Sequence, residues 1–281
     1  MPLTSFQAFV LKLLCANRPP DSYLAGGAAL HLEPQSKRYS NDLDFFQDSE
    51  ARVASAFAQD RETLEAAGLE LDVLIEQPGF IRAIVKQDPD ATKVDWAQDS
   101  AWRFLPTIQH EVAGYQLHPM DLAINKLLAL AGRNEPRDFL DIMEVHRRVL
   151  PLGALCWAAS GKDPGFTPAL LLDLLRRRGT VRTEDLKRLH LTGAPDLAEL
   201  KREWLTALDE ADAFVRSRPP DELGCLYYSK SRGAFVGNPA AVPDARPHFG
   251  RPGGVLPRVV DDLLTPRRRA RGARARRTRT R

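Results

Sequence analysis

The sequence predicts an α+β fold: a small mixed sheet with flanking helices, then a helical domain. The first part of the chain alternates short apolar runs with turn residues, as strands do. From Pro119 onward, apolar residues recur at helical spacing instead. Beyond about Asn238, Pro, Gly and Arg dominate, and such a composition predicts disorder. The expected parts are an α/β domain over residues 1–117, a helical domain over 118–238 and a disordered Arg-rich tail over 239–281.

Composition narrows the class of protein. The chain has 281 residues, of which 43% are hydrophobic and 27% charged, as in ordinary globular proteins with a sizeable core. No apolar run approaches the roughly 20 residues that span a bilayer. The three cysteines lie far apart and the six histidines lack metal-ligand spacing, which argues against a disulfide scaffold and a zinc site. We therefore expect a cytoplasmic protein without a membrane partner.

Charge is distributed unevenly along the chain. Residues 239–281 hold twelve Arg and three Asp, a net charge of +9, whereas the whole chain carries only +3. The remaining 238 residues therefore carry −6. An acidic body joined to a basic end is compatible with a nucleic-acid partner for that end.

Local patterns predict the individual elements. Thr4 and Gln7 fit a capping box at the start of the first helix. Short apolar runs between turn residues predict strands at 22–25, 43–46, 69–75, 80–85, 92–96 and 112–117. Helical periodicity predicts helices at 6–14, 26–30, 50–67, 121–131, 136–149, 168–178 and 196–215.

The most informative local pattern is RYSNDLDFF at residues 38–46. Because side chains alternate along a strand, Asp42 and Asp44 project from one face, about 7 Å apart, while Leu43 and Phe45 point to the other. Two such carboxylates repel each other unless a cation lies between them, and oxygen ligands favour Mg²⁺ or Mn²⁺ over zinc. The alternative interpretation is a solvated acidic strand edge.

Two further features help to decide between a metal site and a solvated strand edge. Asp95 lies in another expected strand with an apolar neighbour on each side. If that strand pairs with 43–46, Asp95 completes a three-carboxylate, two-metal site; otherwise it is a surface residue. Gly26 and Gly27 lie at a strand-to-helix turn, where free N–H groups let a phosphate approach. A simple tight turn is the alternative, since no Walker A Lys follows.

The helix at 121–131 supplies basic residues. Lys126 and Arg133 are seven positions apart and therefore share one helix face. Cationic groups directed at a metal–phosphate site would neutralise triphosphate charge. The alternative is a solvated cationic stripe, with Asp138 and Asp141 as acids at the start of the next helix.

The order of these motifs resembles the AbiEii/AbiGii-type nucleotidyltransferases, the family of the MenT-like toxins, in the DNA polymerase β superfamily. The shared order is GG, then R-x-S-x-D-L-D-F, a later strand aspartate, K-L-x-A-L-x-x-R and R-D-x-x-D. The resemblance covers about residues 23–145. It implies a polymerase-β-like nucleotidyltransferase fold for the first domain. The superfamily usually has Gly-Ser where this chain has Gly26 and Gly27, so phosphate contact here must rely on backbone N–H groups.

The resemblance also implies roles for single residues. It makes Asp42 and Asp44 catalytic metal ligands, with Asp95 as the third metal ligand. It makes Lys126 and Asp141 catalytic as well. Around the nucleotide it places Gly26, Gly27, Arg38, Ser40, Arg133 and Asp138.

The activity implied by the resemblance is transfer of an NMP from an NTP, with Mg²⁺ or Mn²⁺ as the cofactor and release of pyrophosphate. A tRNA 3′ end is among the acceptors it suggests, and a separate antitoxin protein is the expected partner of a toxin of this kind. Two alternatives stay open. The protein is a catalytically inactive nucleic-acid binder that acts through its basic tail, or it modifies a small molecule such as an antibiotic.

Overall fold

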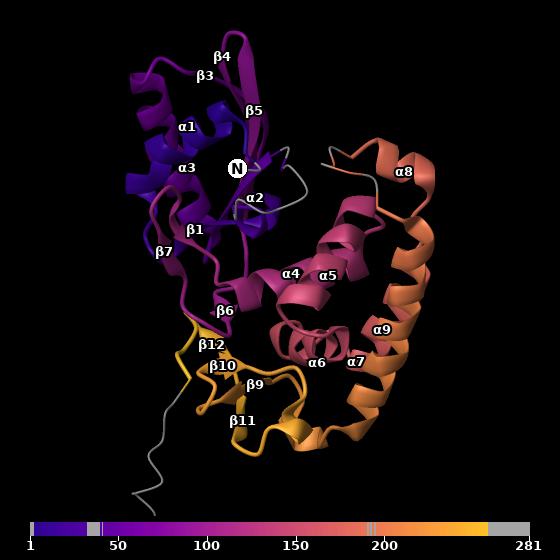
Figure 1. The fold of residues 1–281 in the computed structure, drawn as a ribbon. Helices are drawn as coiled ribbons and strands as arrows, with labels where there is room; N and C mark the ends of the chain where they lie inside the picture. The colour runs from indigo at the N-terminus through magenta and orange to yellow at the C-terminus, as the bar shows by residue number, and fades with distance from the viewer. Residues whose placement is uncertain are drawn as a thin grey trace, which may run out of the picture.

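The computed structural model describes residues 3–32, 40, 42–189, 191, 193 and 195–257. A sheet with its helices forms one half of the molecule, helices form the other, and a small group of strands lies beneath both (Figure 1). The predicted α+β fold is confirmed. Arg38 and residues 258–281 lie outside the described residues.

The main sheet has seven strands in the order β3-β4-β5-β2-β1-β8-β7. Their bounds are β1 (Ser22–Ala25), β2 (Asp42–Gln47), β3 (Glu70–Gln77), β4 (Phe80–Gln87), β5 (Asp90–Gln98), β7 (Ile108–His110) and β8 (Gly114–Gln116). The pairs β2–β5 and β1–β8 are parallel, and the other pairs are antiparallel. The sheet is therefore mixed, as predicted, and the six predicted strands all lie in it.

Two helices, α1 (Ser5–Leu14) and α3 (Glu50–Ala66), cover one face of this sheet. The predicted capping box is present: Gln7 N–H donates to the Thr4 hydroxyl, and Thr4 N–H donates to the Gln7 side chain, each at 3.0 Å. Alternate residues of the central strands are buried under these helices, namely Leu43, Phe45, Ile81, Ala83, Val85, Val94 and Trp96. The residues between them face the other side, next to α2 (Gly26–Leu30).

The second half of the molecule is helical. It contains α4 (Pro119–Gly132), α5 (Pro136–Arg148), α6 (Leu152–Lys162), α7 (Pro168–Arg178), α8 (Thr183–Lys187) and α9 (Leu197–Ser217). Trp204 of α9 packs edge-on against Phe139 of α5, with ring centroids 5.1 Å apart. Among the helices of the described residues, none has both the length and the apolar character that crossing a membrane requires.

Asp121 in the first turn of α4 joins the two halves. Its carboxylate is fully buried and accepts hydrogen bonds from the backbone N–H groups of Phe104 and Leu105, at 2.8 and 3.0 Å. Burial raises the pKa of Asp121 to about 6, although both hydrogen bonds oppose this shift. Two N–H groups that would otherwise be unpaired thus fix the position of α4 against the chain that leaves the sheet.

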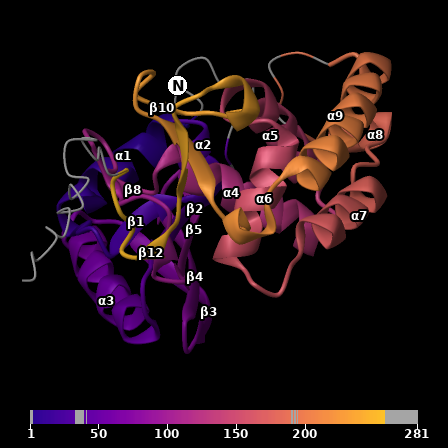
Figure 2. The ribbon, with the colours of Figure 1, turned by 90° about the horizontal axis from the view of Figure 1, so that it is seen from below.

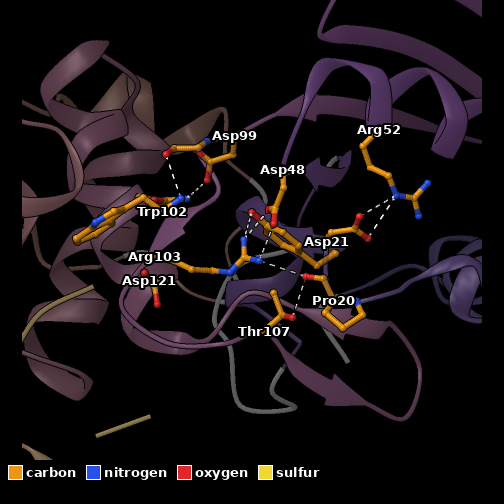
Figure 3. A network of polar contacts seen from close by, with 12 residues as sticks. Pro20, Asp21, Asp48, Arg52, Asp99, Trp102, Arg103, Thr107 and Asp121 are labelled. Carbon is orange, nitrogen blue, oxygen red and sulfur yellow. Dashed lines mark hydrogen bonds and ion pairs between the residues drawn. The ribbon is translucent and has the colours of Figure 1, made fainter. Parts of the chain in front are cut away.

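Arg103 makes a second connection, from the strand β6 (Trp102–Arg103) to the residue that follows β2, the central strand of the main sheet (Figure 3). Its guanidinium donates to both carboxylate oxygens of Asp48, at 2.7 and 2.9 Å, and lies over the ring of Tyr23. Thr107 donates to the carbonyl oxygen of Pro20 at 3.0 Å. These contacts attach the segment between the two halves to the end of β2.

The structure corrects the predicted start of the tail. Strands β9 (Leu226–Ser229), β10 (Ala234–Phe235) and β11 (Ala245–His248) form a three-stranded sheet. Strand β12 (Arg251–Pro252) pairs with β6. Residues 239–257 are therefore not disordered, although composition predicts that they are.

The prediction from composition is wrong because residues 239–257 are kept ordered by backbone pairing with distant segments. His248 contacts the carbonyl oxygen of Phe104 at 3.0 Å, and the Val255 N–H donates to the same residue at 3.1 Å. Gly254, at φ +76°, approaches the backbone of Leu105 so closely that a Cβ would overlap it. Seen from below, these strands lie across the junction of the main sheet with α4 and α6 (Figure 2).

We predict that a chain ending at Pro257 keeps the thermal midpoint of the full-length protein, whereas one ending at Asn238 loses at least about 5 °C. The shorter chain lacks β11 and β12, so β6 loses its strand partner and β9 keeps only β10. Differential scanning calorimetry of the three chains measures this. Equal midpoints for the full-length chain and the chain ending at Asn238 would show that residues 239–257 do not support the fold.

Candidate active site

A cavity of about 540 Å³ lies between the uncovered face of the main sheet and the helices α4, α5 and α6. It brings together most residues that the sequence singled out, namely Gly26, Gly27, Asp42, Asp44, Asp95, Lys126 and Arg133. Ser40, Asp138 and Asp141 do not line it. The cavity is the candidate active site.

Strand alternation and strand pairing place the three carboxylates. Asp42 and Asp44 face the cavity from β2, while Leu43 between them is fully buried on the opposite face. Strand β5 pairs with β2 in parallel, so Asp95 lies opposite Asp44 and Lys93 lies opposite Asp42. The strand pairing that Asp95 needs in order to join the other two acids is therefore present.

Two of the carboxylates are paired with cations. Lys93 Nζ lies 2.8 Å from Asp42 Oδ2, and Arg137 lies 3.8 Å from the same oxygen. Arg82 of β4 donates two hydrogen bonds to Asp95, at 2.8 and 2.7 Å. Burial acts to raise the pKa of Asp42, but Lys93, with Arg137, holds it below its ordinary value.

Asp44 differs from its two neighbours. No ion-pair partner for its carboxylate exists among the described residues. Burial, together with the charges of Asp42 and Asp95, raises the pKa of Asp44 to about 6. Gly26, at φ +62°, lies directly against this carboxylate, and a Cβ there would overlap it. Only glycine meets both constraints at this turn.

A buried ion-pair network lies behind the cavity wall and positions its cations. Lys126 Nζ lies 2.9 Å from Asp141 and 3.6 Å from Asp138. Arg133 donates two hydrogen bonds to Asp138, at 2.6 and 3.2 Å, and His31 contacts Asp141 at 2.9 Å. Through these contacts Asp138 and Asp141 position the side chains of Lys126 and Arg133. Neither acid lines the cavity itself.

Ser40 has a local role in this structure. Its hydroxyl donates to the backbone oxygen of Asp42 at 2.9 Å, and its own carbonyl accepts from the Gln7 side chain at 3.1 Å. These contacts fix the start of β2. The hydroxyl also lies 3.4 Å from Asp42 Oδ1, so Ser40 contacts a cavity carboxylate although it does not line the cavity itself. Arg38, the other residue predicted ahead of the aspartates, lies outside the described residues.

The sequence interpretation missed several residues of the cavity, above all Arg82 and Lys93. A signal for Lys93 was present, because residues two apart on a strand share a face and Lys93 precedes Asp95 by two. Arg82 depends on the register of the β4–β5 hairpin, which pairs it with Asp95. In the described residues, no group of three or more acidic, His or Cys side chains is arranged to hold a metal ion.

Comparison with known proteins identifies the family of the chain. Residues 12–223 match the family model described as nucleotidyl transferase AbiEii toxin, type IV toxin–antitoxin system. No curated protein matches the chain. MenT4, a nucleotidyltransferase toxin from Mycobacterium tuberculosis, is similar in fold at 18% identity and a TM-score of 0.50, covering 77% of this chain and 83% of its own.

JHP933 from Helicobacter pylori is also similar, at 18% identity and a TM-score of 0.47, covering 75% of this chain and 90% of its own. At 18% identity the similarity to MenT4 indicates the fold alone, and the family model carries the assignment. Because that model matches 12–223 of the 281 residues, the chain belongs to the AbiEii family of nucleotidyltransferase toxins.

Proposed function

We propose that this protein transfers an NMP from an NTP to the 3′ hydroxyl of an RNA, with a tRNA 3′ end as the acceptor. The observation that carries the proposal is the meeting of Asp42, Asp44 and Asp95 in one cavity with the basic side chain of Lys126. In this reaction the 3′ oxygen forms a bond to the α-phosphorus, and the bond between the α- and β-phosphates breaks. Pyrophosphate leaves.

The donor set fits Mg²⁺ or Mn²⁺. Asp42 and Asp44 would be the main ligands and Asp95 the third, all of them hard oxygen donors. Asp44 supports this fit, because it has no ion-pair partner among the described residues and because burial, followed by the charges of Asp42 and Asp95, raises its pKa. A divalent cation bound there neutralises phosphate charge and lowers the pKa of the acceptor hydroxyl.

The basic residues of the cavity would bind the triphosphate. Lys126 and Arg133 approach it from α4, and Arg137 approaches it from the start of α5. Asp138 and Asp141 keep the first two cations in position through short ion pairs. In this proposal Asp141 is a positioning residue, since its carboxylate contacts Lys126 and does not line the cavity.

The proposed RNA acceptor rests on charge. Residues 258–281 contain ten Arg and two Asp, so this end of the chain attracts polyanions, whereas the body of the protein is acidic. We further propose that the protein works in the cytoplasm, where NTPs and tRNA are available, and that an antitoxin protein restrains it. The family description, a type IV toxin–antitoxin system, supports the last point.

We predict that Asp42→Ala and Asp44→Ala each lower nucleotide transfer at least about 100-fold, roughly 2.7 kcal/mol of barrier. The fold should survive, because removing one of several repelling carboxylates costs little stability. The assay incubates each labelled NTP with Mg²⁺ and total tRNA and resolves the products on a gel. Asp173→Ala, an exposed acid on α7, is the control.

Unchanged transfer in either aspartate variant would contradict the assignment of the site. Label that appears on a small molecule or on a protein, and not on RNA, would refute the proposed acceptor while leaving the chemistry in place.

For the basic end of the chain, we predict that deleting residues 258–281 weakens RNA binding and flattens the dependence of log affinity on log salt concentration. Fewer cations then release fewer counterions from the RNA. Transfer at saturating RNA should persist, because no residue of the cavity is removed. Binding titrations at several salt concentrations measure the slope, and identical slopes for both chains would show that this segment does not touch RNA.

A further inference from the structure

One end of the cavity holds a polar cluster that phosphate binding does not need. Its members are Asn125 on α4, Asp99 directly after β5, and Lys162 at the end of α6. Asp99 Oδ2 accepts hydrogen bonds from Lys162 Nζ at 3.1 Å and from Asn125 Nδ2 at 3.2 Å. Asp99 thereby fixes both side chains at the cavity wall.

Asn125 Oδ1 is buried and accepts no hydrogen bond from any described residue. Its orientation is determined by chemistry, because a carboxylate only accepts hydrogen bonds, so the NH₂ group must face Asp99. Buried acceptors are nearly always satisfied in folded proteins. An unsatisfied one in the wall of a substrate cavity therefore points to an N–H donor on the ligand.

Lys162 offers the complementary group. Its side chain is 6% exposed, and Asp99 accepts one of its three N–H donors. The cluster thus presents a buried acceptor on Asn125 and a fixed donor on Lys162, both anchored to the same carboxylate oxygen.

The secondary structure places this cluster at the nucleoside end of the cavity. Along β2 the residues that face the cavity change from Asp42 and Asp44 to Phe46. Strand β5 runs parallel to β2 and changes from Lys93 and Asp95 to Asp99 in the same direction. Strand β2 therefore leads from carboxylates to an aromatic ring, and β5 leads to Asp99, which holds Asn125 and Lys162.

Cationic and uncharged residues are also arranged in order along helix α4. The cationic Arg133 directly follows its last residue, eight residues or about 12 Å from Asn125. Between them, Lys126 and the apolar Ala129 line the cavity. A nucleotide with its phosphates beside Arg133 and Lys126 would direct its base toward Asn125.

We propose that Asn125, Lys162 and Asp99 form the subsite that selects the nucleobase of the NTP. Asn125 Oδ1 accepts an N–H of the base, Lys162 Nζ donates to the adjacent ring nitrogen or carbonyl oxygen, and Phe46 contacts the ring. Asp99 positions the first two side chains. This inference rests on the proposed function and extends it from phosphate chemistry to the choice of base. A site built to hydrogen-bond a substrate strongly rejects analogues that leave its buried polar groups unpaired.

The test measures nucleotide binding without an acceptor. The dissociation constants of the four NTPs and of inorganic tripolyphosphate are determined with Mg²⁺ by isothermal titration calorimetry for the full-length protein. The wild-type protein should bind one NTP at least about 10-fold more tightly than the weakest of the four, about 1.4 kcal/mol. Tripolyphosphate, which has no base, reports the phosphate end alone.

Two variants remove the two base contacts separately. Asn125→Leu keeps a similar volume without the amide, and Lys162→Met keeps the chain without the charge. Each should reduce the preference among NTPs to less than about 3-fold and leave the tripolyphosphate constant within about 2-fold. Lys201→Met, an exposed lysine on α9, is the matched control and should keep the wild-type preference. If Asn125→Leu does not fold, Lys162→Met decides the question.

The failures of the two proposals are distinguishable. A wild-type protein that binds no NTP overturns the proposed function and this inference together. Equal binding of the four NTPs, or an unchanged preference in the variants, overturns the base subsite alone. A uniform loss of affinity in Lys162→Met that includes tripolyphosphate also overturns it, because Lys162 would then contact phosphates.

Discussion

The candidate site depends on the parallel pairing of β2 with β5. This register sets Asp44 opposite Asp95 and Asp42 opposite Lys93, so three acids and a lysine share one sheet face. A shift of one residue in either strand would turn its acids into the apolar core and its core residues into the cavity. The burial of Leu43, Val94 and Trp96 under α1 and α3 excludes that shift. The hydrophobic core on one face of the sheet therefore determines the chemistry on the other.

The same register brings like charges together, and the protein offsets most of that repulsion with its own cations. Arg82 pairs with Asp95, and Lys93 and Arg137 pair with Asp42. Asp44, pressed against Gly26, has no such partner among the described residues. Negative charge is thus concentrated at one carboxylate in the middle of the cavity, where a divalent cation would relieve the repulsion.

The parts of the site that follow from local periodicity could be predicted from the sequence. Asp42 and Asp44 share a face because they are two apart on a strand. Lys126 and Arg133 both line the cavity, but Arg133 follows the last residue of α4 in extended backbone, so helical spacing alone does not place it there. The contact of Asp95 with Arg82 depends on a hairpin register, and the Lys162–Asp99 pair joins the end of α6 to the end of β5. No local pattern contains such long-range contacts.

Three other features could not be predicted from the local sequence. Helix α6 is buried on nearly every side, so it lacks the polar stripe from which an amphipathic helix is recognised. Residues 239–257 have the composition of a disordered segment, yet β11 and β12 find backbone partners in β9 and β6. The sequence predicts that Asp138 contacts the nucleotide and that Asp141 is catalytic, but the structure places both behind Lys126.

The central claim is that the shared carboxylate face of β2 and β5 binds a divalent metal ion. Mn²⁺ binding, followed by electron paramagnetic resonance with a non-hydrolysable NTP analogue present, tests it directly. The wild-type protein should bind Mn²⁺, and Asp44→Asn should weaken that binding at least about 10-fold, because an amide replaces the charged oxygen ligand. Equal Mn²⁺ affinity in the two proteins would contradict the claim.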